Sequence, residues 1–332
     1  MTLFVGQSDV PRLLPMAECI DAVEAALLAL ARGEAVQPLR QVTHLPGRNG
    51  LVATMPAHVG PLRSVGVKAI TVFHGNEGTP FDSHQGAILL FDDAHGRLLA
   101  VVDATAVTAI RTAAASAVAT RALARDDATE LAIVGTGVQA RSHLEAMLLV
   151  RPIRRVRVCG RDLPRARRFA DEAALRYGVP AEAAPSVREA VEGADIVCTV
   201  TSSPEPVVLG AWIADGAHIN AVGACVPTRR ELDTAAVVRA RLFVDRRESV
   251  LREAGDFLLA RAEGAVDDAH VLAEIGEVLA GQAEGRRTRQ DVTLFESLGL
   301  GIEDVAAACV VVRNAERTGA GTRFELGGAR HG

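Results

Sequence analysis

Cysteine pairs, a targeting segment and long apolar runs are all missing from this chain of 332 residues, and each absence excludes a class of protein. The five cysteines are widely spaced and contain no Cys-x-x-Cys pair, so neither a metal site nor a redox motif is indicated. Met1–Pro15 lacks the basic and apolar regions of a signal peptide, and no apolar run reaches the ~18 residues of a membrane span. We therefore expect a cytoplasmic protein with reduced thiols and no membrane contact.

The net charge and the aromatic content are also low. The formal net charge is −5, there is one Trp and one Tyr, and no basic stripe with interleaved aromatics occurs, so no nucleic-acid partner is expected. Apolar residues make up 49% of the chain, which is ordinary for a globular protein. Because a single core stops growing at roughly 250–300 residues, we expect two cores.

The first third of the sequence has the pattern of a helix followed by a connected sheet. Helical spacing of apolar residues predicts a helix over Met16–Gly33. Turn residues separate the β-prone runs that follow, so we expect hairpin-like strands and not βαβ units. These runs are Gln41–Leu45, Leu51–Met55, Gly66–Phe73, Gly86–Asp92 and Leu98–Asp103.

The pattern changes after an Ala-rich helix expected over Thr105–Leu123. Apolar strands are then predicted at Leu131–Val134, Val156–Cys159, Ile196–Val200, His218–Val222 and Leu242–Val244. Helices are predicted at Val138–Val150, Leu163–Tyr177, Ser186–Glu192, Thr234–Arg239 and Ile302–Arg317. Apolar strands alternating with helices are typical of a parallel sheet that is covered on both faces. The fold class is therefore α/β, with a Rossmann dinucleotide-binding domain beside an α+β domain.

A dinucleotide fingerprint opens the second part. The strand Leu131–Val134 leads into Gly135-Thr136-Gly137-Val138-Gln139-Ala140, and a helix follows, which is the GxGxxA form of the motif. Gly135 allows the tight turn, Gly137 lets the pyrophosphate approach the backbone, and the helix N-terminus attracts its charge. This placement after a strand and before a helix is what makes the motif specific.

The tip of the second strand favours NADP(H), with NAD(H) as the other possibility. An NAD site usually has an acidic residue there, whereas this chain has Gly160-Arg161, and Arg165 follows one turn later. Arginine pairs well with a 2′-phosphate. The alternative is that Arg161 is only solvated and that Asp162 binds the ribose of NAD.

Three further segments carry chemistry-bearing residues. Lys68 lies within a β-prone apolar run, Arg111-Thr112 lies on the Ala-rich helix, and Asp233 follows the strand that ends near Gly223. Open α/β sheets bind ligands beyond the carboxyl ends of their strands, so Asp233 is expected near the cofactor.

At these residues the chain resembles the ornithine cyclodeaminase/mu-crystallin family over nearly its whole length. The matching segments are Gln37-Pro38-Leu39-Arg40, Met55-Pro56, Lys68, Ser83-His84-Gln85-Gly86, Leu89-Leu90-Phe91, Ile110-Arg111-Thr112-Ala113-Ala114, Gly135–Gln139, His218–Gly223, Arg230–Asp233 and Ser297-Leu298-Gly299. The resemblance implies a homodimer. It also implies the chemistry of the family, whose members interconvert amino acids with imines or keto acids and use a nicotinamide cofactor. It implies a substrate-binding and dimerisation domain (residues 1–115 with 302–332) and a Rossmann domain (residues 116–301).

The resemblance also assigns site residues. Asp233 and Lys68 are the expected catalytic residues: Asp233 exchanges a proton with the substrate nitrogen, and Lys68 contacts the substrate carboxylate or carbonyl. The expected substrate-binding residues are Arg40, Arg111, Met55, His84 and Gly299. The expected cofactor-binding residues are Thr112, Gly135, Gly137, Val138, Gln139, Arg161, Arg165, Thr199, Val200, Thr201, Val222 and Gly223.

Several of these residues have a plainer interpretation. A lysine in a strand is usually exposed, and Asp233 can instead be the N-cap of the helix predicted over Thr234–Arg239. His84 is either a site residue or a hydrogen-bonding support for one. Glu231 is expected to be a solvated neighbour or an ion-pair partner.

One departure from the family narrows the function. At the segment where this chain has Val52-Ala53-Thr54-Met55-Pro56, the resemblance to ornithine cyclodeaminases implies Ile-Glu-Leu-Met-Pro. The glutamate that can serve a second substrate amine is therefore replaced by Ala53. We therefore expect an NAD(P)-dependent imine reductase or amino-acid dehydrogenase acting on a small amino acid or imine. The alternatives are a redox-neutral, ammonia-releasing cyclodeaminase with bound NAD, and a non-enzymatic small-ligand binder like mu-crystallin.

Overall fold

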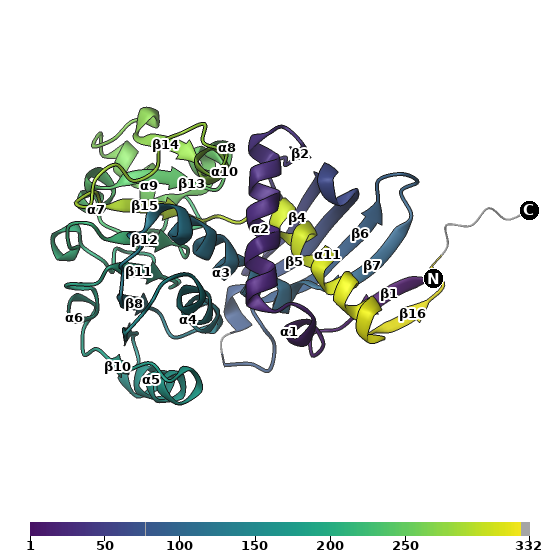
Figure 1. Ribbon diagram of the computed structural model, residues 1–332, viewed down its shortest axis with the longest axis horizontal. Helices are drawn as coiled ribbons and strands as arrows, with labels where there is room; N and C mark the ends of the chain where they lie inside the picture. The colour runs from purple at the N-terminus through teal and green to yellow at the C-terminus, as the bar shows by residue number, and fades with distance from the viewer. Residues whose placement is uncertain (77, 327–332) are drawn as a thin grey trace, which may run out of the picture. The chain divides into compact units, whose positions relative to one another are not determined.

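A computed structural model describes residues 1–76 and 78–326 of the chain. The described residues fold as two compact units, one formed by residues 1–111 with 299–326, the other by residues 112–298 (Figure 1). In the described ranges, none of the helices combines the length and the apolar character of a membrane span.

A mainly antiparallel sheet forms the first unit. The order of its strands is β16-β1-β7-β6-β5-β4-β2, with β3 also paired to β4. The strands are β1 (Thr2–Val5), β2 (Ala35–Val36), β3 (Gln41–His44), β4 (Gly50–Val59), β5 (Ser64–Phe73), β6 (His84–Asp92), β7 (Leu98–Asp103) and β16 (Thr322–Phe324). The five predicted runs are confirmed as strands, and β4 to β7 are consecutive antiparallel neighbours, as expected.

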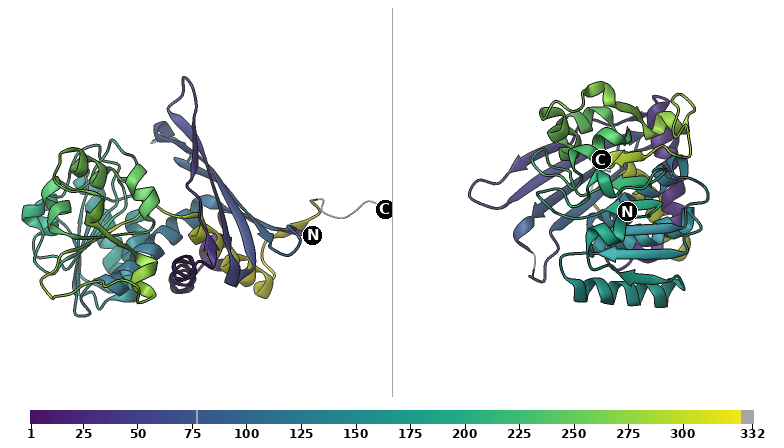
Figure 2. Two further views of the ribbon diagram at one scale, coloured as in Figure 1. Left: turned by 90° about the horizontal axis from the view of Figure 1, so that it is seen from above. Right: turned by 90° about the vertical axis from the view of Figure 1, so that its left-hand side faces the viewer.

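Helices cover one face of this sheet. They are α1 (Val10–Leu13), α2 (Met16–Ala31) and α11 (Gly301–Thr318), and Figures 1 and 2 show α2 and α11 against the same face. The side chains that point to these helices, such as Met55, Ile88 and Val102, are buried. On the other face the strands present half-exposed apolar residues such as Val67 and Leu89. This alternation is typical of a sheet with one covered face.

The second unit contains the parallel sheet that the fingerprint predicts. Its order is β10-β9-β8-β11-β12-β15-β13-β14, and every pairing is parallel. The strands are β8 (Glu130–Val134), β9 (Arg155–Cys159), β10 (Ala181–Ala183), β11 (Ile196–Thr199), β12 (His218–Ala221), β13 (Arg241–Val244), β14 (Val271–Glu274) and β15 (Thr293–Glu296). The order reverses at β8, between β9 and β11, which is where doubly wound sheets bind ligands.

The helices of this unit follow the predicted alternation. The helices α4 (Val138–Val150), α5 (Leu163–Tyr177), α6 (Val187–Val191) and α7 (Thr234–Arg239) match the predicted ones within two residues at each end, as does α3 (Ala104–Leu123), whose residues up to Arg111 belong to the first unit. The sequence pattern did not predict α8 (Arg247–Glu253), α9 (Gly255–Ala262), α10 (Ile275–Leu279), β14 or β15. These elements have four to eight residues each, too few for a helical or alternating period to stand out.

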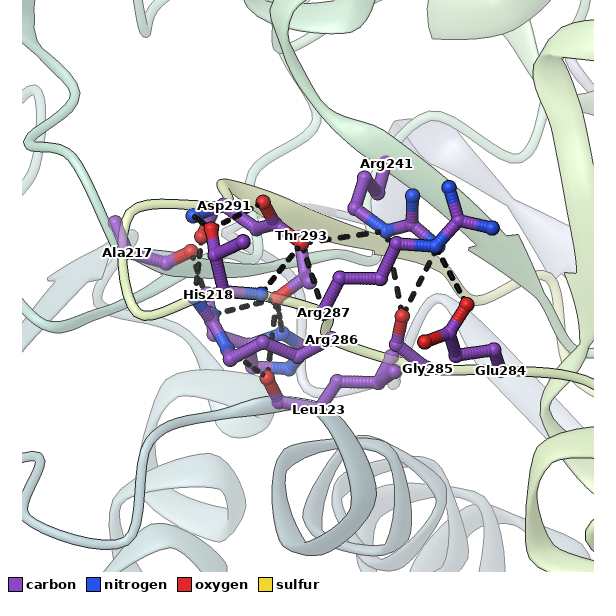
Figure 3. Close-up of polar contacts among 11 residues, drawn as sticks. Leu123, Ala217, His218, Arg241, Glu284, Gly285, Arg286, Arg287, Asp291 and Thr293 are labelled. Atoms are coloured by element: carbon purple, nitrogen blue, oxygen red, sulfur yellow. Dashed lines mark hydrogen bonds and ion pairs between the residues drawn. The ribbon is translucent and has the colours of Figure 1, made fainter.

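One arginine ties three parts of the parallel-sheet unit together (Figure 3). The guanidinium of Arg286 donates to the carbonyls of Leu123 and Ala217 and to Oγ1 of Thr293, and these residues lie at the end of α3, before β12 and on β15. Burial lowers the pKa of Arg286 to about 10, so the group stays charged at neutral pH. A cation at the C-terminus of α3 also suits the negative end of that helix.

Candidate functional site

Lys68 lies on the covered face of β5, with its side chain only 1% exposed. Its Nζ donates to Oδ1 of Asp304 at 3.0 Å. The plainer interpretation of Lys68 as an exposed strand residue is therefore wrong. The 36 Lys and Arg residues of the chain include a single lysine, and that lysine is the buried one.

Arg111 approaches the same carboxylate from α3. Its Nε donates to Oδ1 of Asp304 at 3.0 Å, and its Nη1 donates to Oε2 of Glu303 at 2.9 Å. All four side chains are at most 6% exposed. Buried charges are costly unless they are paired, and here two cations share two carboxylates at the start of α11.

The charge state of Lys68 depends on this arrangement. Burial and the nearby positive charge of Arg111 lower its pKa, the charge of Asp304 opposes them, and the resulting pKa is about 8. An arginine cannot lose its proton in a protein, whereas a lysine with such a pKa titrates close to neutrality.

Two other expected substrate-binding residues adjoin this cluster. Nη2 of Arg40 donates to the carbonyl of Gly299 at 3.2 Å. Gly299 has φ +83°, and a Cβ there would lie 2.4 Å from Nη1 of Arg111, so no other residue fits. Met55 is buried and pairs with Lys68 across β4 and β5.

His84 is not brought to the cluster. It is exposed at the start of β6, four residues before Ile88, the residue that pairs with Lys68. Four residues span about 13 Å along a strand. The expectation that His84 binds substrate therefore receives no support from its position in this unit.

Sequence reasoning missed Glu303 and Asp304. Both are fully buried, although they lie in the first turn of α11, where acidic residues are normally explained by the helix dipole. The signal was present: two adjacent acids precede the apolar run Val305–Val312.

The cofactor motif in the parallel-sheet unit has the expected geometry. Gly135 has φ +128°, its N–H donates to the carbonyl of Cys159, and a Cβ would lie 2.7 Å from the carbonyl oxygen of Val200. Gly137 is different, because a Cβ there would meet no atom within 4 Å among the described residues beyond its chain neighbours. The open space beside Gly137 is what a closely approaching pyrophosphate needs.

The start of α4 also fits an anionic group. Gly137 is the N-cap residue, and no side chain in the described ranges caps this helix. Val138 is 61% exposed and Gln139 follows it, while Thr112 is buried on α3. The N-terminal dipole of this 13-residue helix thus favours an anionic group beside the exposed Val138.

Glu231 supports the neighbouring strand ends and is not solvated, so that expectation is wrong. It is fully buried, and its two carboxylate oxygens accept the N–H groups of Thr201 at 2.5 Å and Gly223 at 2.7 Å. Thr199 and Val200 at the end of β11, and Val222 at the end of β12, lie in the same two segments. One side chain therefore joins the two loops in which five cofactor-binding residues are expected.

Asp256 in turn holds Glu231. Its Oδ1 accepts the N–H groups of Glu231 and Leu232, each at 2.8 Å. Burial, with the charge of Glu231, raises the pKa of Asp256 to about 8. The sequence did not indicate a supporting role for either acid, because Asp and Glu side chains are mostly exposed in proteins.

Asp233 makes the contacts of a helix N-cap. Its Oδ1 accepts the N–H groups of Ala236 and Gly210, each at 2.8 Å. The plainer of its two roles is thus present, and proton exchange stays a prediction.

The tip of β9 has exposed arginines. Arg161 and Arg165 are both exposed, and Asp162 accepts the N–H of Arg165 at 3.0 Å as the N-cap of α5. The described residues contain no group of acids, histidines and cysteines that can hold a metal ion.

Comparisons with known proteins show what the whole chain is similar to. Residues 1–319 match the ornithine cyclodeaminase/mu-crystallin family. The chain is 40% identical over 295 residues to the ketimine reductase mu-crystallin of Mus musculus, covering 88% of this chain and 90% of that protein.

Two solved structures share the whole fold. The Delta(1)-pyrroline-2-carboxylate reductase of Thermococcus litoralis, in complex with NADH and L-proline, has a TM-score of 0.95 and 39% identity, covering 97% of this chain and all of that one. An archaeal alanine dehydrogenase dimer with bound NAD has a TM-score of 0.93 and 33% identity, covering 98% of this chain and 99% of that one.

Proposed function

This chain belongs to the ornithine cyclodeaminase/mu-crystallin family, and from that membership we propose that it is an NAD(P)-dependent oxidoreductase acting on C–N bonds. The reaction is the reduction of an imine that carries a carboxylate to an amino acid, or its reverse. The substrate is a cyclic ketimine or an adduct of a keto acid and an amine.

The observation that carries this proposal is the buried pair of cations, Lys68 and Arg111. An ammonium and a guanidinium together can bind a carboxylate through charge-assisted hydrogen bonds. Because Asp304 and Glu303 hold both cations in place before a ligand arrives, little ordering is needed on binding. Ala53 lies on the same covered face, with 4% of its side chain exposed, and offers no partner to a second substrate amine.

Each step of the chemistry has a candidate residue. The bound nicotinamide supplies or accepts the hydride. Lys68 and Arg111 orient the substrate through its carboxylate, so the carbon beside it is presented in one geometry. Asp233 exchanges the proton that the nitrogen gains or loses.

Turnover assays test the function directly. Delta(1)-pyrroline-2-carboxylate appears in the names of relatives from Bacillus cereus and Thermococcus litoralis. With this substrate we expect steady consumption of NAD(P)H. With L-ornithine we expect no release of ammonia. Ammonia without net cofactor turnover would make the chain a cyclodeaminase, and no turnover with any imine would favour a ligand-binding role.

The same assay tests cofactor choice. We propose NADP(H) as the preferred cofactor, because Arg161 and Arg165 follow the tip of β9 and the Asp162 carboxylate is engaged by an N–H at the start of α5. The expected result is a higher kcat/KM with NADPH than with NADH. A strong preference for NADH would remove the role given to Arg161.

We also propose that the chain is a homodimer joined through the open face of the first unit's sheet. Val65 and Val67 of β5 pair with Phe91 and Leu89 of β6 on this face, and Leu89 pairs with Val101 of β7. All five side chains are exposed or half-exposed. A contiguous apolar face of this kind marks an interaction surface.

Light scattering tests the dimer. The wild type should have about twice the chain mass of 34.9 kDa, and Val65→Asp should shift it to the monomer. Leu175→Asp is the matched control, because Leu175 is 90% exposed on α5 and outside the proposed interface. A wild-type mass of one chain would exclude this dimer.

A further inference from the structure

The carboxylate of Asp304 is shared by the two cations that the proposed reaction uses. Its Oδ1 accepts hydrogen bonds from both Lys68 and Arg111, each at 3.0 Å, although the two donors come from β5 and α3. Two like charges this close, away from water, repel each other strongly unless a negative charge lies between them. Glu303 also accepts a hydrogen bond from Arg111, at 2.9 Å.

We propose that Asp304 is a positioning residue that holds Lys68 and Arg111 side by side and keeps the ammonium of Lys68 charged for the substrate carboxylate. The proposal rests on the proposed function, because it assigns Lys68 to a substrate carboxylate. It adds a residue that is not expected to touch the substrate and acts only through two that are.

The groups around Lys68 support this role. Arg111 from α3 and Arg40 from the segment before β3 both favour loss of its proton, and Asp304 from α11 opposes them through its charge and its hydrogen bond. Cys19 of α2 packs near the same acids, and burial keeps its thiol neutral by raising its pKa. With burial included, the pKa of Lys68 is about 8. Without Asp304, burial and the two arginines act unopposed.

Because Lys68 is the single lysine of the chain, the titration of its side chain can be measured directly. Because the chain has one lysine, protein grown with lysine labelled at Cε with ¹³C carries one labelled side chain, and the chemical shift of that carbon reports its protonation. We expect a midpoint near pH 8 in the wild type. In Asp304→Asn, which keeps the shape and loses the charge, the midpoint should fall by about one pH unit or more.

Glu303→Gln is the matched control. It removes an equal charge one residue away, from a carboxylate that accepts a hydrogen bond from Arg111, so the Lys68 midpoint should fall less than it does in Asp304→Asn. An unmoved midpoint in Asp304→Asn, or an equal fall in both variants, would overturn the proposal.

Kinetics then separates this inference from the proposed function. If both hold, the alkaline limb of the pH profile of kcat/KM for imine reduction follows the NMR midpoint in each variant, and KM rises more than kcat falls. A purely structural loss would lower activity equally at every pH and contradict the inference. If the wild type shows no imine turnover, the proposed function fails, while the NMR titration still decides whether Asp304 sets the charge of Lys68.

Discussion

Lys68→Met is expected to lower kcat/KM for imine reduction by about 30- to 5,000-fold. Methionine has nearly the same length and fits an apolar site, but it leaves the substrate carboxylate and Asp304 without the ammonium. Removing one partner of a buried, hydrogen-bonded charge pair costs about 2–5 kcal/mol, which corresponds to that range. Steady-state kinetics at pH 7, where Lys68 is mostly protonated, measures the loss.

Two controls identify the cause of the loss. Cofactor binding, followed by NAD(P)H fluorescence, should change little, because the fingerprint glycines lie in the unit of residues 112–298 and Lys68 lies in the other one. Lys68→Arg keeps the positive charge but puts a larger, planar group at a site that is 1% exposed, so it should recover only part of the activity. Full activity in Lys68→Met would remove Lys68 from the mechanism.

Asp233→Asn is expected to lower turnover by about 10²- to 10⁴-fold, the usual size of a lost proton-transfer catalyst. This substitution separates the two roles of Asp233. Asparagine caps helices as well as aspartate does, so its side-chain oxygen can still accept the N–H groups of Ala236 and Gly210. It cannot exchange a proton.

The melting temperature provides the control for Asp233→Asn. It should stay close to the wild-type value, whereas Asp233→Ala should lower stability by about 0.5–2 kcal/mol through loss of the cap. If Asp233→Asn keeps full turnover, the residue is a cap only and the proton must come from elsewhere.

Much of the fold follows from local pattern. The fingerprint Gly135–Ala140, the alternation of apolar strands with helices, and the Ala-rich α3 each depend on residues close in sequence, so composition and spacing suffice to predict them. The same holds for the antiparallel run from β4 to β7, because turn residues separate its strands. The lysine on the covered face of β5 was singled out for its apolar neighbours and its family resemblance.

Other features were decided by contacts between distant residues. The four-residue β15 enters the sheet between β12 and β13, although it follows both in the chain, and no local period can specify a neighbour. Asp304 meets Lys68 across 236 residues, and Asp256 meets Glu231 across 25. The sequence thus determined that the chain has a dinucleotide fold and that Lys68 is a candidate for catalysis. Only tertiary packing decided which carboxylates are buried beside it, because the charge of a buried group depends on what the rest of the chain places next to it.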